Sequence, residues 1–396
     1  MDRRLLVLAL GMFAIGTDSF VVAGILPAVS QSLNEPVALV GQMVTLYALS
    51  YALLSPVVGA LAGHWPRKTL LLGGLGVFIV GNVMTALAPT LTLVFISRVV
   101  AGLGAAMFSP TATATGASLV PPEQRGRALA VVIAGLTSAT ALGSPIGTVL
   151  AGLADWRITM WFVAALGLAS AIGIWVLMPQ VPTPAAVSLR QRLAPLADSR
   201  VTLTLLTTLM AYGGLFLVYT YLGVTFDRVT GGDGNVLAAL LFVWGIAATL
   251  GNIIAGRLTD KLGSRRIING AIIVAAINFA LLPWSSAHLA TAIAALIVWG
   301  ICGWGLLVPQ QHRLLTIAPA LAPLVMGLNS AATYLGVSMS GPLGAFGVTY
   351  FDKYHLGLFG AFFIAISLVM AELAHGRIVR RTTAGARLDA VTLGRA

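Results

Sequence analysis

Twelve long apolar runs follow one another along this chain of 396 residues, and they constrain its fold more than any other feature. A helix of about 20 mostly apolar residues crosses the hydrocarbon core of a bilayer. Charged residues make up only 9% of the chain, whereas a soluble globular protein has roughly 25%. We therefore predict an all-α integral membrane protein. Its twelve transmembrane helices are expected at approximately 5–29, 38–62, 69–88, 91–118, 127–153, 159–178, 201–226, 235–256, 267–284, 290–312, 323–348 and 356–376.

The first apolar run resembles a secretory signal at its start, MDRRLLVLALGMFAIG. It continues for about 24 residues without an A-x-A-like cleavage site, which is longer than the apolar region of a signal peptide. We therefore interpret it as the first membrane span.

The basic residues predict which loops face the cytoplasm. If the amino terminus lies inside, most of the 23 lysines and arginines fall in the inner loops and the two tails. This positive-inside pattern accounts for most of the net charge of +11. We expect both termini in the cytoplasm and the chain in the cell (inner) membrane. Nucleic-acid binding would require basic residues on one folded face, so we expect no nucleic-acid partner.

The two halves of the chain resemble each other. Residues 179–200 are rich in proline and polar residues and lie at the midpoint, as expected of a linker. GALAGHWPRK at 59–68 is echoed by GRLTDKLGSRR at 256–266, and GLTSATALG at 135–143 is echoed by GLNSAATYLG at 327–336. Each echo falls at the same place in its half, which favours duplication over chance. We predict two pseudo-symmetric six-helix bundles (1–182 and 201–380), a cytoplasmic linker (183–200) and a cytoplasmic tail (381–396).

Four stretches resemble the major facilitator superfamily, and within it the twelve-helix drug:proton antiporters of the bacterial sugar-efflux and chloramphenicol-resistance branch. They are GALAGHWPRK, LVFISRVVAGLGAAMFSP, GLTSATALGSPIGTVLAG and GTDSFVVAGILPAVS. The resemblance covers about residues 5–378. It implies the major facilitator fold and alternating access between the two bundles, with a proton gradient as the energy source and no bound cofactor.

The chain departs from the pattern of that family at a few positions. Asp18 directly follows the Gly-Thr pair of the first helix, and Ser19 stands where the branch usually has its acid. Ser144 replaces a glycine of the fifth-helix signature. Gly63 stands where the first basic loop usually has an acid, whereas the second loop retains Asp260.

Asp18 is the one acid that the predicted spans place deep in the membrane. A charged Asp at the centre of a span costs about 2.5–3.5 kcal/mol on insertion scales, and protonation removes its charge. Asp18 therefore suits a proton carrier, and the alternative is a structural Asp bonded to a neighbouring group. Arg98 lies within roughly 5 Å of the same depth on the fourth helix. We predict that the two residues interact and couple protons to substrate, unless Arg98 only binds backbone carbonyls.

Aromatic residues at helical spacing form stripes on the predicted helices, because residues three and four apart share one face. A cavity with aromatic walls and few polar groups suits an uncharged or amphipathic small molecule. The alternative is that the stripes serve helix packing or anchor the helices at the membrane interface. The predicted cavity residues are Tyr47, Tyr51, Tyr212, Phe216, Tyr219, Trp299 and Gln310.

The fifth helix is rich in small residues, which let membrane helices approach closely, and it contains a proline that favours a kink. The resemblance places this helix between the two bundles. We expect Gly135, Gly143, Pro145 and Gly147 to seat it against a helix of the other half.

The two basic loops are predicted to form an inner gate. The resemblance implies that an acid in such a loop faces the start of a helix in the other half, where the helix dipole favours negative charge. We expect Asp260 to make this contact near Gly126 and Arg127 in the outward-facing state. The predicted gate residues are Gly59, Arg67, Lys68, Gly256, Asp260, Arg265 and Arg266.

Enzyme chemistry is not indicated, because the spans contain no Ser/His/Asp set, metal cluster or Walker loop. The single cysteine, Cys302, cannot form a disulfide within the chain. We predict a secondary transporter that exports a small drug-like or amphipathic molecule, a sugar or a metabolite in exchange for protons. The alternatives are an uncoupled facilitator, an importer or a membrane binding protein without transport. The expected partners are the substrate, protons and the lipid bilayer, and we expect a monomer.

Overall fold

The computed structural model describes residues 2–153, 155–181 and 187–393. Residues 183–186 of the predicted linker and 394–396 of the predicted tail lie outside the described residues. Within the described part, every regular element is helical.

Twelve helical spans in the described residues are long and apolar enough to cross a membrane, which confirms the predicted number. We number these spans 1 to 12 in chain order. Their bounds are α1 (Arg3–Leu33), α2 with α3 (Val37–Leu61), α4 (Arg67–Leu87), α5 (Leu91–Ser118), α6 with α7 (Arg125–Leu153), α8 (Arg157–Leu177), α10 (Ser199–Thr220), α13 (Gly234–Leu262), α14 (Ser264–Ser285), α15 with α16 (Leu289–Ile317), α17 with the 3₁₀ turn before it (Pro319–Tyr350), and the span of α18 (Lys353–Arg380).

Several spans contain shorter pieces. The divided spans consist of α2 (Val37–Val40) and α3 (Gln42–Leu61), α6 (Arg125–Ser138) and α7 (Ser144–Leu153), α15 (Leu289–Gly305) and α16 (Leu307–Ile317), while α17 itself is Ala322–Tyr350 and α18 is Leu356–Leu393. Short helices also lie outside the spans: α9 (Leu189–Leu193) in the linker, and α11 (Leu222–Thr225) and α12 (Asp227–Thr230) between spans 7 and 8.

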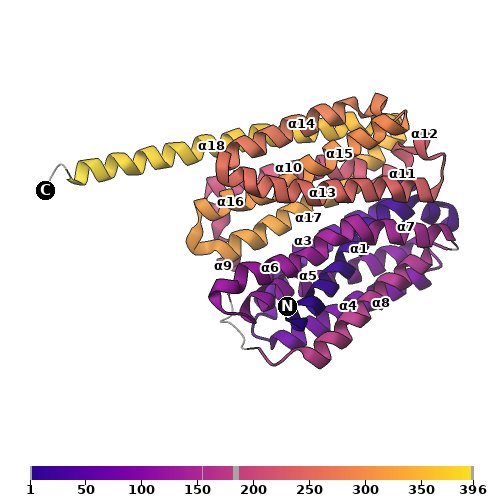
Figure 1. Ribbon diagram of the computed structural model, residues 1–396, viewed down its shortest axis with the longest axis horizontal. Coiled ribbons are helices and arrows are strands. Elements are labelled where there is room, and N and C mark those ends of the chain that lie inside the picture. The colour runs from indigo at the N-terminus through magenta and orange to yellow at the C-terminus, as the bar shows by residue number, and fades with distance from the viewer. Residues whose placement is uncertain (1, 154, 182–186, 394–396) are drawn as a thin grey trace.

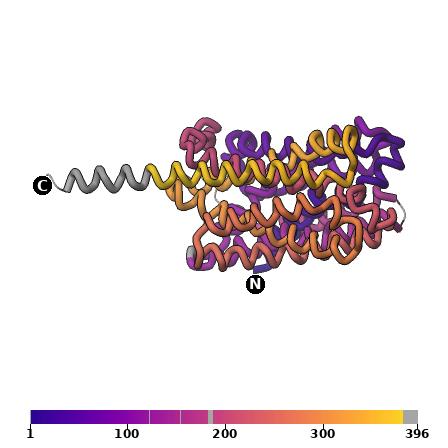
Figure 2. The backbone as a smooth tube through the Cα atoms, turned by 90° about the horizontal axis from the view of Figure 1, so that it is seen from above, coloured from indigo at the N-terminus to yellow at the C-terminus, as the bar shows by residue number. Residues whose placement is uncertain are grey.

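The helices of the first and second halves form two groups that lie side by side, with most of their axes along the long dimension of the molecule (Figure 1). Within the first group α4 packs on α5 and α8, and within the second α10 packs on α17 and α18. Seen from above, α18 runs lengthwise along the face of the second half that is turned to the viewer (Figure 2). We call the end of the bundle where α9 lies the linker end, and the opposite end the far end. Because the number of spans is even, span 1 begins and span 12 finishes at the linker end.

Span 5 contains a π-helical turn, Ala139–Gly143, between α6 and α7. Pro145 lies two residues after the turn and has no backbone N–H, so it cannot donate the α-helical bond to the carbonyl four residues earlier. The wider turn accommodates this missing bond, and π-bulges of this kind are frequent at functional sites. The expected distortion near Pro145 is therefore a π turn on its amino-terminal side.

Span 10 runs to Ile317, five residues past the predicted boundary at 312, and is interrupted between α15 and α16. Pro309 lies four residues after Gly305, the last residue of α15, and cannot donate a bond to its carbonyl. The interruption thus has a local cause in the sequence.

Candidate transport site

A buried ion pair joins spans 1 and 4. Arg98 Nη1 donates a hydrogen bond of 2.7 Å to Asp18 Oδ1, and the two side chains are 1% and 0% exposed. Within the described part of the chain, Asp18 Oδ2 and Arg98 Nε have no hydrogen-bond partner. The carboxylate is therefore held by a cation at one oxygen, and its other oxygen is available to accept a proton.

The phenol ring of Tyr47 covers the Arg98 guanidinium, whose central carbon lies 4.6 Å from the ring centroid. Such a cation–π contact contributes roughly 2 kcal/mol or more when it is desolvated. Ser19 Oγ lies 3.2 Å from Tyr47 Oη and also donates to the Ile15 carbonyl at 2.9 Å. The one-residue offset of the acid therefore lets Asp18 face Arg98 directly, while Ser19 contacts the ring that covers the arginine.

Aromatic rings join the two halves beside this pair. Phe20 on span 1 lies 6.2 Å from Phe216 and 6.1 Å from Tyr219 on span 7, measured between ring centroids. It also meets Trp304 on span 10 edge to face at 5.7 Å. Offset and edge-to-face pairs at these distances add about 0.5–1.5 kcal/mol each beyond the area they bury. Phe20 is two residues after Asp18, so this contact between halves lies close to the ion pair.

Hydrogen bonds reinforce the same contact. Tyr219 Oη donates to the Phe20 carbonyl at 3.0 Å, and Ser144 Oγ donates to the same carbonyl at 3.1 Å. Ser144 belongs to span 5, immediately after the π turn. One carbonyl of span 1 therefore links a hydroxyl of its own half to a hydroxyl of the other half.

The predicted cavity residues are all buried, with exposed fractions of 1–8%. Tyr219 packs against Trp244 at 4.7 Å, Trp244 against Trp299 at 5.9 Å, and Tyr51 stacks on Tyr334 of span 11 at 3.9 Å. In this conformation the aromatic stripes therefore pack against one another, as the packing alternative expects. Tyr51 and Tyr334 belong to different halves, so this stacked pair also crosses the interface.

Three buried polar side chains of spans 7, 8 and 10 lack partners in the described part of the chain. The unpaired atoms are Tyr212 Oη, Trp244 Nε1 and both amide atoms of Gln310. Leaving a buried polar group unpaired costs about 1–3 kcal/mol, so native proteins seldom do it without a reason. The three residues lie on α10, α13 and α16, and α16 packs against both of the other helices. These helices hold donors and acceptors that a ligand could satisfy.

The glycines of span 5 face α1 of the same half and so do not make the contact predicted for them, although span 5 itself packs against α13 of the other half as expected. A Cβ atom at Gly135, Gly143 or Gly147 would collide with Ala9, Thr17 or Val21, all on α1 of the same half. These glycines allow spans 1 and 5 to approach closely, and Pro145 is buried. Span 5 approaches the other half closely at Gly245 on α13. A Cβ there would collide with the Thr140 carbonyl in the π turn.

The basic-loop residues make contacts mostly within their own halves. Lys68 Nζ donates to the Trp175 carbonyl at 2.7 Å, and Arg265 forms a 2.6 Å ion pair with Glu372 on α18. Gly59 differs, because its carbonyl accepts a 2.7 Å hydrogen bond from Arg192 on the linker helix α9. Arg67 and Gly256 are partly buried, and Arg266 is exposed.

The Asp260 side chain is exposed and has no hydrogen bond or ion pair to Gly126, Arg127 or any other described residue. Contacts between the halves lie instead at the far end and in the middle of the bundle. At the far end Tyr221 Oη lies 3.3 Å from the Ala38 carbonyl, and nearer the middle Tyr219 donates to the Phe20 carbonyl. The predicted Asp260 latch belongs to a state closed at the linker end, so for that state it stays a prediction.

Sequence reasoning missed several residues of this region, notably Phe20, Trp244, Trp304, Tyr334 and Gly245. Phe20 and Tyr334 lie inside the quoted stretches GTDSFVVAGILPAVS and GLNSAATYLG, so their positions were available as a signal. The two tryptophans and Gly245 follow no pattern that separates them from packing residues.

Twelve apolar spans in two groups, with a buried ion pair beside the contact between the groups, define a membrane transporter. Residues 8–341 match the family profile of the Major Facilitator Superfamily. The chain belongs to this superfamily, which confirms the resemblance, and like its other members it is a transporter and not an enzyme.

Relatives support the same conclusion. The chain is 27% identical over 340 residues to the Inner membrane transport protein YdhP of Escherichia coli (strain K12), covering 86% of this chain and 87% of that protein. It is 33% identical over 265 residues to a chloramphenicol resistance protein of Streptomyces lividans, covering 66% of this chain and 68% of that one.

The fold matches a solved structure, the crystal structure of a bacterial homologue of the human lysosomal transporter Spinster in an inward-facing and occupied conformation. The TM-score is 0.77 at 17% sequence identity, covering 95% of this chain and 97% of the other. This match establishes the major facilitator fold for the chain.

Proposed function

We propose that the protein is a proton-coupled exporter of a small uncharged or amphipathic molecule. The observation that carries this proposal is the Asp18–Arg98 pair, which is fully buried and leaves Asp18 Oδ2 unpaired. Ionisable side chains inside membrane spans are rare and typically belong to ion or proton pathways. A transporter without ion coupling has no need of such a group.

The pair offers a simple coupling step. A proton arriving at Asp18 Oδ2 neutralises the carboxylate and removes its attraction for Arg98. The guanidinium then turns to another acceptor, and the ring of Tyr47 follows because it lies against the guanidinium. Phe20, two residues along α1, connects this movement to Tyr219 of the other half. Protonation and the contact between the halves are thereby linked.

The substrate class follows from the walls of the site. Aromatic rings pack against Tyr212 and Trp244. The unpaired atoms of these two residues and of Gln310 could bind hydroxyl, amide or carbonyl groups. Such walls suit a largely apolar molecule with few polar groups better than a free sugar. The name of the relative from Streptomyces lividans, chloramphenicol resistance protein, supports a substrate of this class.

We propose that the linker end faces the cytoplasm, since most basic loop residues belong there under the positive-inside rule. Residues 1–182 and 201–380 then act as two bundles that rock about the site as a monomer in the inner membrane. The name of the Escherichia coli relative supports this location. The two halves contact each other at the far end, which closes that side of the site. The substrate would therefore enter from the cytoplasmic side.

Uptake of radiolabelled chloramphenicol into everted membrane vesicles tests the proposal. Wild-type uptake should require respiration and collapse when a proton uncoupler is added. Asp18→Asn should abolish uncoupler-sensitive uptake, whereas Glu123→Gln, at an exposed loop acid, should transport like the wild type. Uptake by the wild type that ignores the uncoupler would identify an uncoupled facilitator and end the proton-coupling proposal.

Counterflow separates coupling from binding. Vesicles loaded with unlabelled chloramphenicol should exchange it for labelled drug without any gradient. Asp18→Asn should retain this exchange, because it removes the titrating group but not the aromatic walls. Loss of exchange together with normal membrane insertion would show that Asp18 instead binds or shapes the substrate site.

A further inference from the structure

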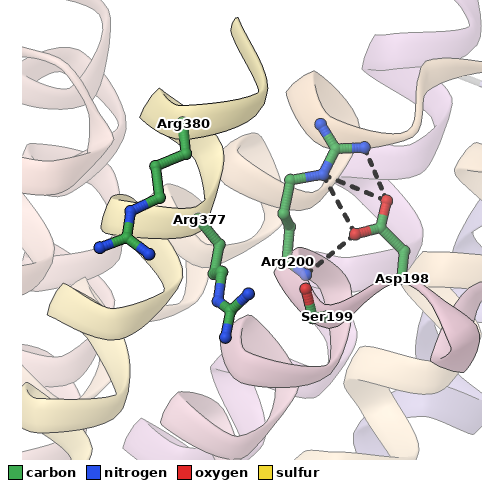
Figure 3. Close-up of a pocket in the computed structure, with 5 residues that line it drawn as sticks. All are labelled: Asp198, Ser199, Arg200, Arg377 and Arg380. Atoms are coloured by element: carbon green, nitrogen blue, oxygen red, sulfur yellow. Dashed lines mark hydrogen bonds and ion pairs between the residues drawn. The ribbon is translucent and has the colours of Figure 1, made fainter. Parts of the chain in front are cut away.

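A recess at the linker end lies outside the transport site. It is lined by Asp198, Ser199 and Arg200 at the start of span 7 and by Arg377 and Arg380 on α18, and its volume is about 280 Å³. Figure 3 shows Arg377 between α18 and the start of α10, Arg380 with its guanidinium turned away from Arg200, and the Arg200 guanidinium turned toward Asp198. Two helices far apart in sequence therefore bring three arginines to one recess.

The charges in the recess are unequal. Arg200 is bound by Asp198, with Nη2 and Oδ2 2.6 Å apart. In the described part of the chain, Arg377 and Arg380 have no ion-pair partner, and both side chains are exposed. The positive-inside rule explains arginines at this end of the spans but not their convergence on a recess. Other cations here are used differently, since Arg265 pairs with Glu372.

An apolar strip leads to the recess along α18. Val369, Leu373, Arg377 and Arg380 are spaced by four, four and three residues, which places them on one face of the helix. Val369 and Leu373 are 55% and 51% exposed. In a membrane span such side chains face lipid chains, and the arginines follow where the span ends. This face of α18 therefore has two exposed apolar side chains, followed by two exposed arginines at the end of the span.

We propose that this recess binds the phosphate-containing headgroup of an anionic phospholipid from the cytoplasmic leaflet. Arginine forms bidentate hydrogen bonds to phosphate oxygens, and basic pockets between spans at the cytoplasmic side bind such headgroups. The acyl chains lie along Val369 and Leu373, which a free phosphate ion would not use. A bound headgroup joins the first turn of span 7 to the end of span 12, next to the linker that connects the halves.

Native mass spectrometry of the purified protein in detergent tests the proposal, with phosphatidylglycerol and phosphatidylcholine added separately. The wild type should retain phosphatidylglycerol much more strongly than phosphatidylcholine. Arg377→Gln with Arg380→Gln should weaken phosphatidylglycerol binding about 25-fold, because each arginine near an anionic lipid contributes roughly fivefold.

The matched control neutralises two other exposed arginines of the linker end, Arg190→Gln with Arg266→Gln. It changes the net charge equally and should leave phosphatidylglycerol binding unchanged. An equal loss of phosphatidylglycerol binding in both double variants would show that the lipid is held by nonspecific charge attraction, and it would contradict a binding site at the recess. Displacement of the lipid by millimolar inorganic phosphate would reassign the recess to a soluble anion.

Discussion

Arg98 approaches Asp18 from one side only: its Nη1 lies 2.7 Å from Oδ1, and Oδ2 has no partner in the described part of the chain. A pair with every lone pair satisfied would resist protonation, because the carboxylate would be stabilised at both oxygens. The one-sided geometry leaves a position for the proton without first breaking the ion pair. Tyr47, which covers the guanidinium, limits the access of water to it.

Arg98→Ala should abolish uncoupler-sensitive export and lower thermal stability in detergent. Removing one partner of a buried pair leaves an uncompensated charge and costs about 3–5 kcal/mol. Asp18→Asn combined with Arg98→Ala should recover part of that stability but no proton coupling. The melting temperatures of the two single variants and the double variant give the coupling energy. Additive effects, or wild-type export by Arg98→Ala, would contradict a functional pair.

Tyr219→Phe removes the hydroxyl that donates to the Phe20 carbonyl across the two halves. We expect a loss of about 1 kcal/mol, the usual net contribution of a hydrogen bond. Tyr212→Phe is the matched control on the same helix, because its buried hydroxyl is unpaired and its loss should be neutral or slightly stabilising. Differential scanning fluorimetry compares them. If Tyr212 Oη contacts the ligand, Tyr212→Phe should weaken substrate binding more than Tyr219→Phe does.

Gly245→Ala places a methyl group against the Thr140 carbonyl, where spans 8 and 5 of different halves meet. Overpacking of this kind costs about 1–3 kcal/mol, and here it should disfavour the state closed at the far end. Transport should fall at least tenfold. Gly270→Ala has open space around its Cβ and serves as the control. Equal transport by both variants would show that the close approach of the two spans is not needed.

Arg192→Ala should release the linker helix from span 2, because it removes the 2.7 Å hydrogen bond to the Gly59 carbonyl. Partial burial lowers the pKa of the Arg192 guanidinium below its ordinary value, so this cation is held where water solvates it incompletely. A spin label on Gln191→Cys should become more mobile in the variant. Arg190→Ala, the exposed neighbour, should leave the label as it is, and equal mobility in both would argue against the attachment.

Asp260→Ala should favour states open at the linker end, if this acid meets a helix dipole when that end closes. The contact is worth about 0.3–1 kcal/mol, which corresponds to a two- to fivefold population change. Ser330→Cys is a suitable probe, because Ser330 is exposed in this structure and the native cysteine is buried. In the Asp260→Ala background, the rate at which a thiol reagent labels this cysteine should rise about two- to fivefold. An unchanged rate would remove Asp260 from the gate.

The spans and the depth of their charges could be predicted from the sequence, because a bilayer imposes a length and a polarity on each helix. The twelve runs, Asp18 and Arg98 all follow from that rule. The rotation of each helix about its axis could not be predicted in the same way. Lipid and neighbouring helices are equally apolar, so hydrophobicity does not distinguish the two faces.

Gly143 illustrates the difference. Its spacing correctly indicated a close helix contact, but the contact is with Thr17 of the same half, and it is Gly245 of α13 that approaches span 5 from the other half. The sequence alone determined a membrane transporter with an acid and a cation at one depth. Only the tertiary structure decided that Asp18 and Arg98 touch, that Phe20 joins the halves, and that Arg377 and Arg380 converge with Arg200. Such contacts depend on how helices distant in sequence are turned toward one another.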